Sequence, residues 1–393
     1  MPFIEYIAAA GGGGPTYPPG GTTSELIPST GTRSTFGSTI AVAGDNSTVA
    51  VGDNGALKVW IFTDPSYSGA WPQESRIDAP GGYSEFGSVA LGISDDGNTL
   101  AVVGATGGSR VVRIYTRSAG TYSHQQTITV PANIVGAWLI SAVALDSTGD
   151  RLAVGAANSS DANGTTGTLH IYKRTAGTWA LEVDKTGVVE DLDYSGSFLG
   201  AGYTLSFSAA GDRLAVCHPY IGYVEVLVRS GTTWTSEYFV NWDACTTVRL
   251  NSDGDKLVSI SNYINNASFP HHYATRSGST WTAAGTFLTS GKATDFNPYT
   301  VTPQHGAALA GDSSRLLIGY GFGHTNSSTG APNQAGRVLT FNSSFTEGTA
   351  VTNPGSTAGL SYWGGAVDIS DDAVLFAAAA QNESAGRAWV RYL

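Results

Sequence analysis

The chain has 393 residues, a formal net charge of -11 and only 20 Lys and Arg residues, a balance that excludes nucleic acid and anionic membranes as main partners. Its hydrophobic content of 41% suffices for a folded core and excludes global disorder. Only 13% of the residues are charged, and Gly, Ser and Thr are abundant, which is typical of a strand-and-turn protein with a neutral polar surface.

The first 21 residues form a segment of their own. Met1 to Ala10 is apolar, lacks a basic flank and is too short to span a membrane, so it predicts neither a secretory signal nor a transmembrane helix. A Gly/Pro-rich linker follows at residues 11–21. An apolar tip on a flexible tether predicts an attachment arm, and a disordered leader is the equal alternative. The residues expected to contact a partner are Phe3, Ile4, Tyr6 and Ile7.

Residues 22–30 have the pattern of one isolated strand, and seven copies of a turn-and-strand pattern follow it. In each copy a polar turn precedes a short apolar strand, as in Ser94–Gly104 and Asp146–Gly155. The same apolar position of that strand is occupied by Val49, Leu100, Leu152, Leu214, Leu257, Leu316 and Leu375. The spacing leaves room for four short strands in each repeat and shows no helical period.

Two further features recur in the repeats. A bulky residue, a glycine and a small residue open several of them, as in Phe36-Gly37-Ser38. Later in four repeats an arginine is followed, five residues on, by an aromatic residue, with a glycine between them. These pairs are Arg117 with Tyr122, Arg174 with Trp179, Arg229 with Trp234, and Arg276 with Trp281. We expect the glycine to supply the positive φ of a hairpin and the aromatic ring to pack beneath the next repeat.

The two ends of the repeat array complement each other. The last repeat stops after its third strand, Gly386 to Tyr392, while the strand at residues 22–30 precedes the first repeat. Pairing these strands would complete the last sheet and close a ring without open edges. The sequence therefore predicts an all-β chain: an N-terminal arm (residues 1–21) and a seven-bladed β-propeller (residues 22–393) closed by its N-terminal strand.

The repeats resemble FG-GAP repeats, the propeller family of integrin α-subunit headpieces that also occurs in bacterial and phage surface proteins. The resemblance rests on the bulky-Gly-Ser openings, the Asp-Gly turns, the Leu-Ala-Val-Gly strands and the Arg-x-x-Gly-x-Trp hairpins, and it covers residues 22–393. It implies a seven-bladed propeller used for adhesion or assembly, often without catalysis. It does not specify a ligand.

The resemblance also suggests a calcium site, because some blades of that family bind calcium through alternating acidic residues. The turns here lack the full alternating set, so we expect structural turns, with calcium as the alternative. The better candidate ligands for an ion are Asp161 and Asn163, in the loop Asn158–Gly164. The two cysteines, Cys217 and Cys245, are expected to be small buried residues rather than a disulfide or a metal pair.

Long loops are the expected place for ligand binding. Two of them combine aromatic and polar side chains that could stack on sugar rings, with ordinary loop packing as the alternative. The candidate residues are Tyr263, Phe269, His271, His272, Phe322 and His324.

The leading functional prediction is a non-enzymatic virion protein, such as a tail fibre, spike or capsid decoration. It would join other virion subunits through its arm and present the propeller for assembly or for binding a glycan or protein of the host surface. No cofactor is expected, with calcium as the alternative. The alternative is a cell-surface, carbohydrate-binding adhesin. A glycoside hydrolase is the third hypothesis, because Ser94-Asp95-Asp96-Gly97 resembles a sialidase-like box whose Asp-to-Gly spacing is one residue too short. Hydrolysis would require a carboxylate pair or an arginine cluster on one face of the ring.

Overall fold

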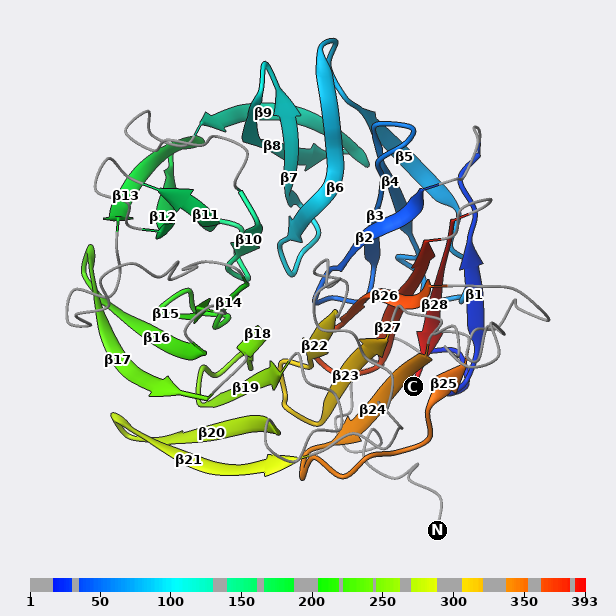
Figure 1. Cartoon of the computed structure of the whole chain (residues 1–393). Coiled ribbons are helices and arrows are strands. Elements are labelled where there is room, and N and C mark those ends of the chain that lie inside the picture. Colours follow the sequence, from blue (N-terminus) through cyan, green and yellow to red (C-terminus); the bar gives the residue numbers. More distant parts are fainter. Residues whose placement is uncertain are drawn as a thin grey trace, which may run out of the picture.

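The computed structural model describes residues 17–29, 35–129, 140–160, 166–186, 204–218, 222–242, 245–261, 270–287, 306–320, 337–352, 362–381 and 386–393. All elements in these ranges are β-strands, and they form seven four-stranded sheets arranged as blades around a central channel (Figure 1). The chain is thus a seven-bladed β-propeller, as the repeats predict. No helix in the described part of the chain is long and apolar enough to cross a membrane.

Each blade is antiparallel, and its strands run in order from the channel outward. Blade one has β2 (Phe36–Val42), β3 (Thr48–Asp53), β4 (Lys58–Thr63) and β5 (Gln73–Asp78). Blade two has β6 (Tyr83–Ile93), β7 (Thr99–Thr106), β8 (Ser109–Ser118) and β9 (Thr121–Thr129). Blade three has β10 (Ala142–Leu145), β11 (Arg151–Ser160), β12 (Thr166–Thr175) and β13 (Thr178–Thr186). Blade four has β14 (Leu205–Phe207), β15 (Arg213–His218), β16 (Tyr223–Ser230) and β17 (Thr233–Asn241).

The remaining blades follow the same order. Blade five has β18 (Cys245–Leu250), β19 (Lys256–Ser261), β20 (His271–Ser277) and β21 (Thr280–Phe287). Blade six has β22 (Ala307–Leu309), β23 (Arg315–Tyr320), β24 (Arg337–Asn342) and β25 (Val351–Thr352). Blade seven has β26 (Tyr362–Ile369), β27 (Leu375–Gln381), β28 (Arg387–Tyr392) and, as its outer strand, β1 (Thr23–Leu26) from the start of the chain.

The first and second strands of every blade are joined by a tight turn, here called the inner turn. Where its first residue is polar, the side chain binds the backbone of the turn: Ser94 Oγ accepts the N–H of Thr99 at 2.9 Å, and Asp146 Oδ1 accepts the N–H of Arg151 at 3.0 Å. The fourth residue has a φ between 59° and 66° in all seven turns, a conformation that favours glycine. These residues are Asn46, Gly97, Gly149, Gly211, Gly254, Ser313 and Ala373.

Seven hydrophobic clusters fill the interfaces between neighbouring blades. Between blades two and three, for example, Val103 and Ile114 pack against Leu152 and Val154, all fully buried. Burying one such side chain stabilises the fold by roughly 1.5–3 kcal/mol. Because each cluster combines residues of two blades, the blades stabilise one another rather than folding around a single common core.

The third and fourth strands are joined by an outer hairpin, which lies beside the inner turn: the N–H of Arg174 donates to the carbonyl oxygen of Asp150 at 2.8 Å. We call the side of the ring that carries the inner turns and outer hairpins the turn face. The hairpin glycine has a positive φ, as predicted, for example 83° at Gly177. The direction predicted for the aromatic residue is wrong, however. Trp179 shares a sheet face with Leu152, which faces blade two, so its ring packs against the preceding blade.

The ring closes as the sequence predicts, by pairing of β1 with β28 in the register Thr23↔Arg391 to Leu26↔Ala388. Residues just before β1 also contact this junction on the turn face. Tyr17 packs edge-on against Tyr67 with 5.0 Å between ring centroids, and its hydroxyl donates to Asp372 Oδ2 at 3.4 Å. We call the interface between blades seven and one the seam.

Candidate functional site

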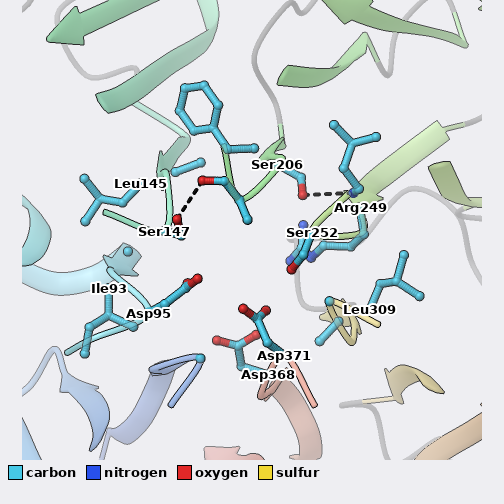
Figure 2. A pocket seen from close by; sticks show the side chains of 18 of the residues that line it. Ile93, Asp95, Leu145, Ser147, Ser206, Arg249, Ser252, Leu309, Asp368 and Asp371 are labelled. Carbon is cyan, nitrogen blue, oxygen red and sulfur yellow. Dashed lines mark hydrogen bonds between the residues drawn. The ribbon is translucent and has the colours of Figure 1, made fainter. Parts of the chain in front are cut away.

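The central channel contains a cavity of about 200 Å³ near the turn face, lined by the first strands and inner turns of all seven blades (Figure 2). Its lining residues occupy equivalent positions in all seven repeats. The second residue of each inner turn forms a mouth ring, consisting of Gly44, Asp95, Ser147, Ala209, Ser252, Gly311 and Asp371. The residue two positions before each turn forms a deeper ring, consisting of Ala41, Gly92, Ala144, Ser206, Arg249, Ala308 and Asp368. Each ring therefore carries two charged residues among small ones.

Backbone hydrogen bonds link the inner turns into a circuit around the mouth. In each of six successive interfaces an N–H of one turn donates to the second residue's carbonyl oxygen in the next turn, over 2.9–3.4 Å. Asp95 N, for example, donates to Ser147 O at 3.0 Å. At the seam, side chains of blade seven link the blades: Asp368 Oδ2 accepts the N–H of Val42 at 2.8 Å, and Asn46 Nδ2 donates to Asp372 Oδ2 at 2.9 Å.

Asp95 and Asp371 form a hydrogen-bonded carboxyl pair in the mouth ring, across the intervening blade one. Gly44 of that blade leaves the room: a Cβ there would lie 2.9 Å from Asp371 Oδ2 and 2.9 Å from Asp95 Cγ. Burial, together with the neighbouring Asp371 charge, raises the pKa of Asp95 to about 8. At neutral pH the Asp95 carboxyl group therefore keeps its proton.

Asp368 and Arg249 form an oppositely charged pair in the deeper ring, and they too are separated by one blade, whose residue at this level is Ala308. Burial raises the pKa of Asp368 to about 6, against the opposing effects of the Val42 N–H and the Arg249 charge. Burial likewise lowers the pKa of Arg249. Figure 2 shows the three aspartates pointing into the cavity from the side of blades seven and two, and Arg249 and Ser252 facing them.

The carboxyl pair bears on the hydrolase hypothesis. Glycoside hydrolases hold their two carboxyl groups about 5 Å or more apart, so that a sugar carbon or a water fits between them. Asp95 and Asp371 are neighbours on either side of Gly44, and after burial the Asp371 charge is the largest cause of the raised pKa of Asp95.

Metal binding was an alternative for the polar turns. In the described ranges no group of three or more His, Cys, Asp or Glu side chains is arranged to hold a metal ion. The acidic turn residues bind their own backbone instead: Asp146 Oδ1 accepts two N–H groups, and Asp96 Oδ1 accepts the N–H of Asn98 at 2.9 Å.

The hairpin arginines are also engaged within the scaffold. Arg174 Nε donates to Asp150 Oδ1 at 2.8 Å, and Arg276 Nη2 donates to Glu237 Oε1 at 3.0 Å. Arg229 Nη1 donates to the carbonyl oxygen of Gly231 at 2.7 Å. These side chains lie on separate blades and do not line the channel cavity.

Of the residues predicted to bind a ligand, the structure describes His271 and His272, at the start of β20. His271 is 2% exposed, and its Nδ1 accepts the N–H of Ser261 at 3.0 Å, so its side chain lies inside blade five. His272 is half-buried and stacks on Trp242, with 5.3 Å between ring centroids and 7° between planes. Neither lines the channel cavity.

The other predicted site residues lie outside the described residues. They are the arm residues Phe3, Ile4, Tyr6 and Ile7, the loop residues Tyr263, Phe269, Phe322 and His324, and the candidate metal ligands Asp161 and Asn163.

The charged channel residues were not singled out from the sequence, although a signal existed. When the seven repeats are aligned on their inner turns, most residues of the two ring positions are Gly, Ala or Ser. Asp95, Asp371, Arg249 and Asp368 are the exceptions, and a charge at a position that points into a channel indicates a specific role.

Comparisons with known proteins support the fold. No family profile and no curated protein matches the chain. The β-propeller domain of Cps50 (Swd1) from Myceliophteria thermophila is similar in structure, with a TM-score of 0.60 and 10% identity over 94% of this chain and 99% of that one. A functionally unknown protein from Desulfotomaculum acetoxidans has a TM-score of 0.53 and 15% identity over 83% of this chain and 88% of that one. At these identities the similarity is one of fold.

Proposed function

We propose that this chain is a non-enzymatic structural or adhesion protein of a virion, a tail fibre, spike or capsid decoration with an FG-GAP-like propeller, which joins its assembly through residues 1–16. The observation that carries the proposal is the docking of Tyr17 at the seam. Because Tyr17 packs on Tyr67 and bonds to Asp372 and Asn46, the described chain is held at a fixed point of the turn face from residue 17 onward.

A non-enzymatic role is supported by how the polar residues are used. The hairpin arginines bind neighbouring scaffold groups and do not line the channel cavity. A net charge of -11 spread over a surface with few charged residues is compatible with a protein that contacts other subunits or a cell surface.

The arm is tested by particle incorporation. A chain lacking residues 1–16 retains Tyr17 and the seam, so we expect it to fold with an unchanged melting temperature but to be missing from purified particles by mass spectrometry. The point variant Ile4→Asp should reduce incorporation as well, because a charge opposes burial of an apolar tip. The control Thr16→Asp places the same charge in the linker and should be incorporated normally. Normal incorporation of the truncated chain would rule the proposal out.

A second candidate function, glycan binding, is favoured by one surface feature. Phe239 on β17 is 38% exposed and stacks on Tyr223 of β16, with 4.6 Å between ring centroids and 18° between planes. Aromatic side chains exposed in this way are suited to stacking on a sugar. On a glycan array, Phe239→Ala should then lose signal, while Leu181→Ala, which removes another exposed apolar side chain (43% exposed), should keep it. Equal signals from both variants would exclude this surface.

A further inference from the structure

The only two cysteines of the chain, Cys217 and Cys245, belong to different blades and meet in the folded ring. Cys217 is on β15 of blade four, and Cys245 begins β18 of blade five. Their Sγ atoms lie 2.7 Å apart, and both residues are 0% exposed. The only two cysteines of the chain therefore lie side by side across the interface between blades four and five.

The backbones on either side of the cysteines are fixed relative to each other. Thr204 donates its hydroxyl to the carbonyl oxygen of Thr246 at 3.2 Å and accepts the N–H of Val248 at 3.1 Å. Its own carbonyl oxygen accepts the N–H of Cys217 at 3.1 Å. Thr204 therefore connects the strand of Cys217 to the strand of Cys245, and this keeps the two thiols close together.

The surroundings disfavour charged sulfur, and the Cys217 thiol donates to the carbonyl oxygen of Cys245 at 3.3 Å. The pair belongs to the apolar cluster that includes Val224, Val248 and Trp242. Burial and the neighbouring Cys245 thiol raise the pKa of Cys217 well above its usual value, so neither a thiolate nor a metal is stabilised there. A disulfide carries no charge and needs no hydrogen bond, so it suits this environment.

We propose that Cys217 and Cys245 are a covalent modification site, at which an oxidant of the disulfide class cross-links blades four and five. One thiolate attacks a small-molecule disulfide such as oxidised glutathione, which forms a mixed disulfide and releases one glutathione thiolate. The second cysteine then attacks the protein sulfur of that mixed disulfide and displaces the second glutathione. Two protein thiols are oxidised, one disulfide is reduced, and the two protons leave with the glutathione. The reaction takes place when the interface is open, during synthesis or by local unfolding, because the closed interface admits no reagent.

The test uses the full chain, purified in its reduced form and incubated with oxidised glutathione a few degrees below its melting temperature. Samples are then unfolded in the presence of excess alkylating agent and weighed intact. We expect a product that is two hydrogens lighter, monomeric and unalkylated, and whose digest contains one peptide from β15 joined to one from β18. The same chain incubated with reduced glutathione should carry two alkyl groups.

The oxidised product should also melt roughly 5 °C above the reduced one, because the cross-link restricts the unfolded chain. In Cys245→Ala no product without alkyl or glutathione groups can form, and the melting temperature should be the same under both conditions. Stable glutathione adducts on both cysteines of the parent chain, retention of both free thiols, or an oxidised product that melts lower than the reduced one would each overturn the proposal.

Discussion

The seam between blades seven and one differs from the interface between blades four and five in what joins the blades. Blades four and five are consecutive in the chain, and their inner turns are linked by a backbone bond from Ala209 N to Ser252 O of 2.9 Å. At the seam no backbone bond links the inner turns among the described residues, and the carboxylates of Asp368 and Asp372 accept bonds from blade one instead. At the seam, carboxylate side chains thus take the place of the backbone bond that links the inner turns elsewhere.

The seam is also where the channel charges lie. Asp368, Asp371 and Asp372 all belong to blade seven, and their partners are on blades one, two and five. The acidic cluster in the cavity is thus concentrated at the interface whose inner turns, among the described residues, lack the backbone bond present at the other six. We expect its carboxylates to stabilise the contact between blades seven and one.

The largest effect is expected from the core of the seam. Leu26→Ala removes a side chain that is 1% exposed on β1 and should cost about 4 kcal/mol of unfolding free energy in urea titration. It should also accelerate amide hydrogen exchange in β28, because β1 is paired to the ring only through that strand. Leu227→Ala, at the interface between blades three and four, should cost a similar amount without this local exchange. Unchanged exchange in β28 would show that closure does not depend on Leu26.

The next largest loss of stability is expected where a charged hydrogen bond at the seam is removed, and it is compared with the loss of a neutral hydrogen bond at another interface. Asp368→Ala leaves the Val42 N–H unbonded and Arg249 without its opposite charge, which should cost about 3 kcal/mol. The equivalent residue of blade four is Ser206, whose Oγ accepts the N–H of Leu250 at 2.9 Å. Ser206→Ala should cost only about 1 kcal/mol, since it removes one neutral bond. Equal losses in the two variants would contradict a special role of the seam.

The carboxyl pair predicts a pH dependence of the unfolding free energy. Because the pKa of Asp95 is raised to about 8 in the folded chain, the folded state keeps a proton that the unfolded state releases near pH 4. The stabilisation that this proton provides is fully present below pH 4 and is lost as the pH rises toward 8. Above pH 8 the titration of Asp95 no longer changes the unfolding free energy. Asp95→Asn should remove the dependence and gain at least about 2 kcal/mol at pH 8, a figure reduced for solvent access through the channel.

The control for this experiment is the neighbouring carboxylate. Burial tends to raise the pKa of Asp96, but hydrogen bonds from Ser94 and Asn98 outweigh it and lower the pKa. Its contribution is present at neutral pH and is lost on acidification below pH 4, so Asp96→Asn should destabilise the chain at pH 8. Destabilisation by both substitutions at pH 8 would contradict a proton kept by Asp95 at neutral pH.

The smallest effect concerns the inner turns. Ser313 adopts a φ of 60° at the position where four other turns have glycine, and its Oγ is buried without a hydrogen-bond partner among the described residues. Ser313→Gly should therefore stabilise the chain by roughly 1 kcal/mol in thermal unfolding. Ser314→Gly, one residue later, relieves no positive φ and should destabilise slightly. The reverse order would mean that the turn is not strained.

Much of the fold was predictable because it is encoded seven times. A single Asp-Gly turn predicts little, but Gly97, Gly149, Gly211 and Gly254 at one repeat position indicate a fixed turn conformation, and the unpaired strands at the two ends predict closure. The channel site was not predicted, because a repeat pattern emphasises what the copies share. Asp95 and Asp371 differ from their equivalents, and their contact joins blades two and seven, which lie far apart in the sequence. The direction in which Trp179 packs also depends on blade geometry rather than on its own repeat.

The pairing of β1 with β28, which brings the two ends of the described chain together, also bears on circular permutation. Gly20 lies directly against the last residue, since a Cβ there would be 3.1 Å from the carbonyl oxygen of Leu393. A short linker could therefore join residue 393 to residue 20, and new termini could be opened at an outer hairpin such as that of Gly278, around which a Cβ would meet nothing within 4 Å. In such a permutant β28 and β1 become covalently continuous, and the non-covalent strand pairing that closes the ring moves from blade seven to blade five. The contacts of the blade-seven aspartates with blade one would stay the same, because β1 precedes β2 in the chain in both forms.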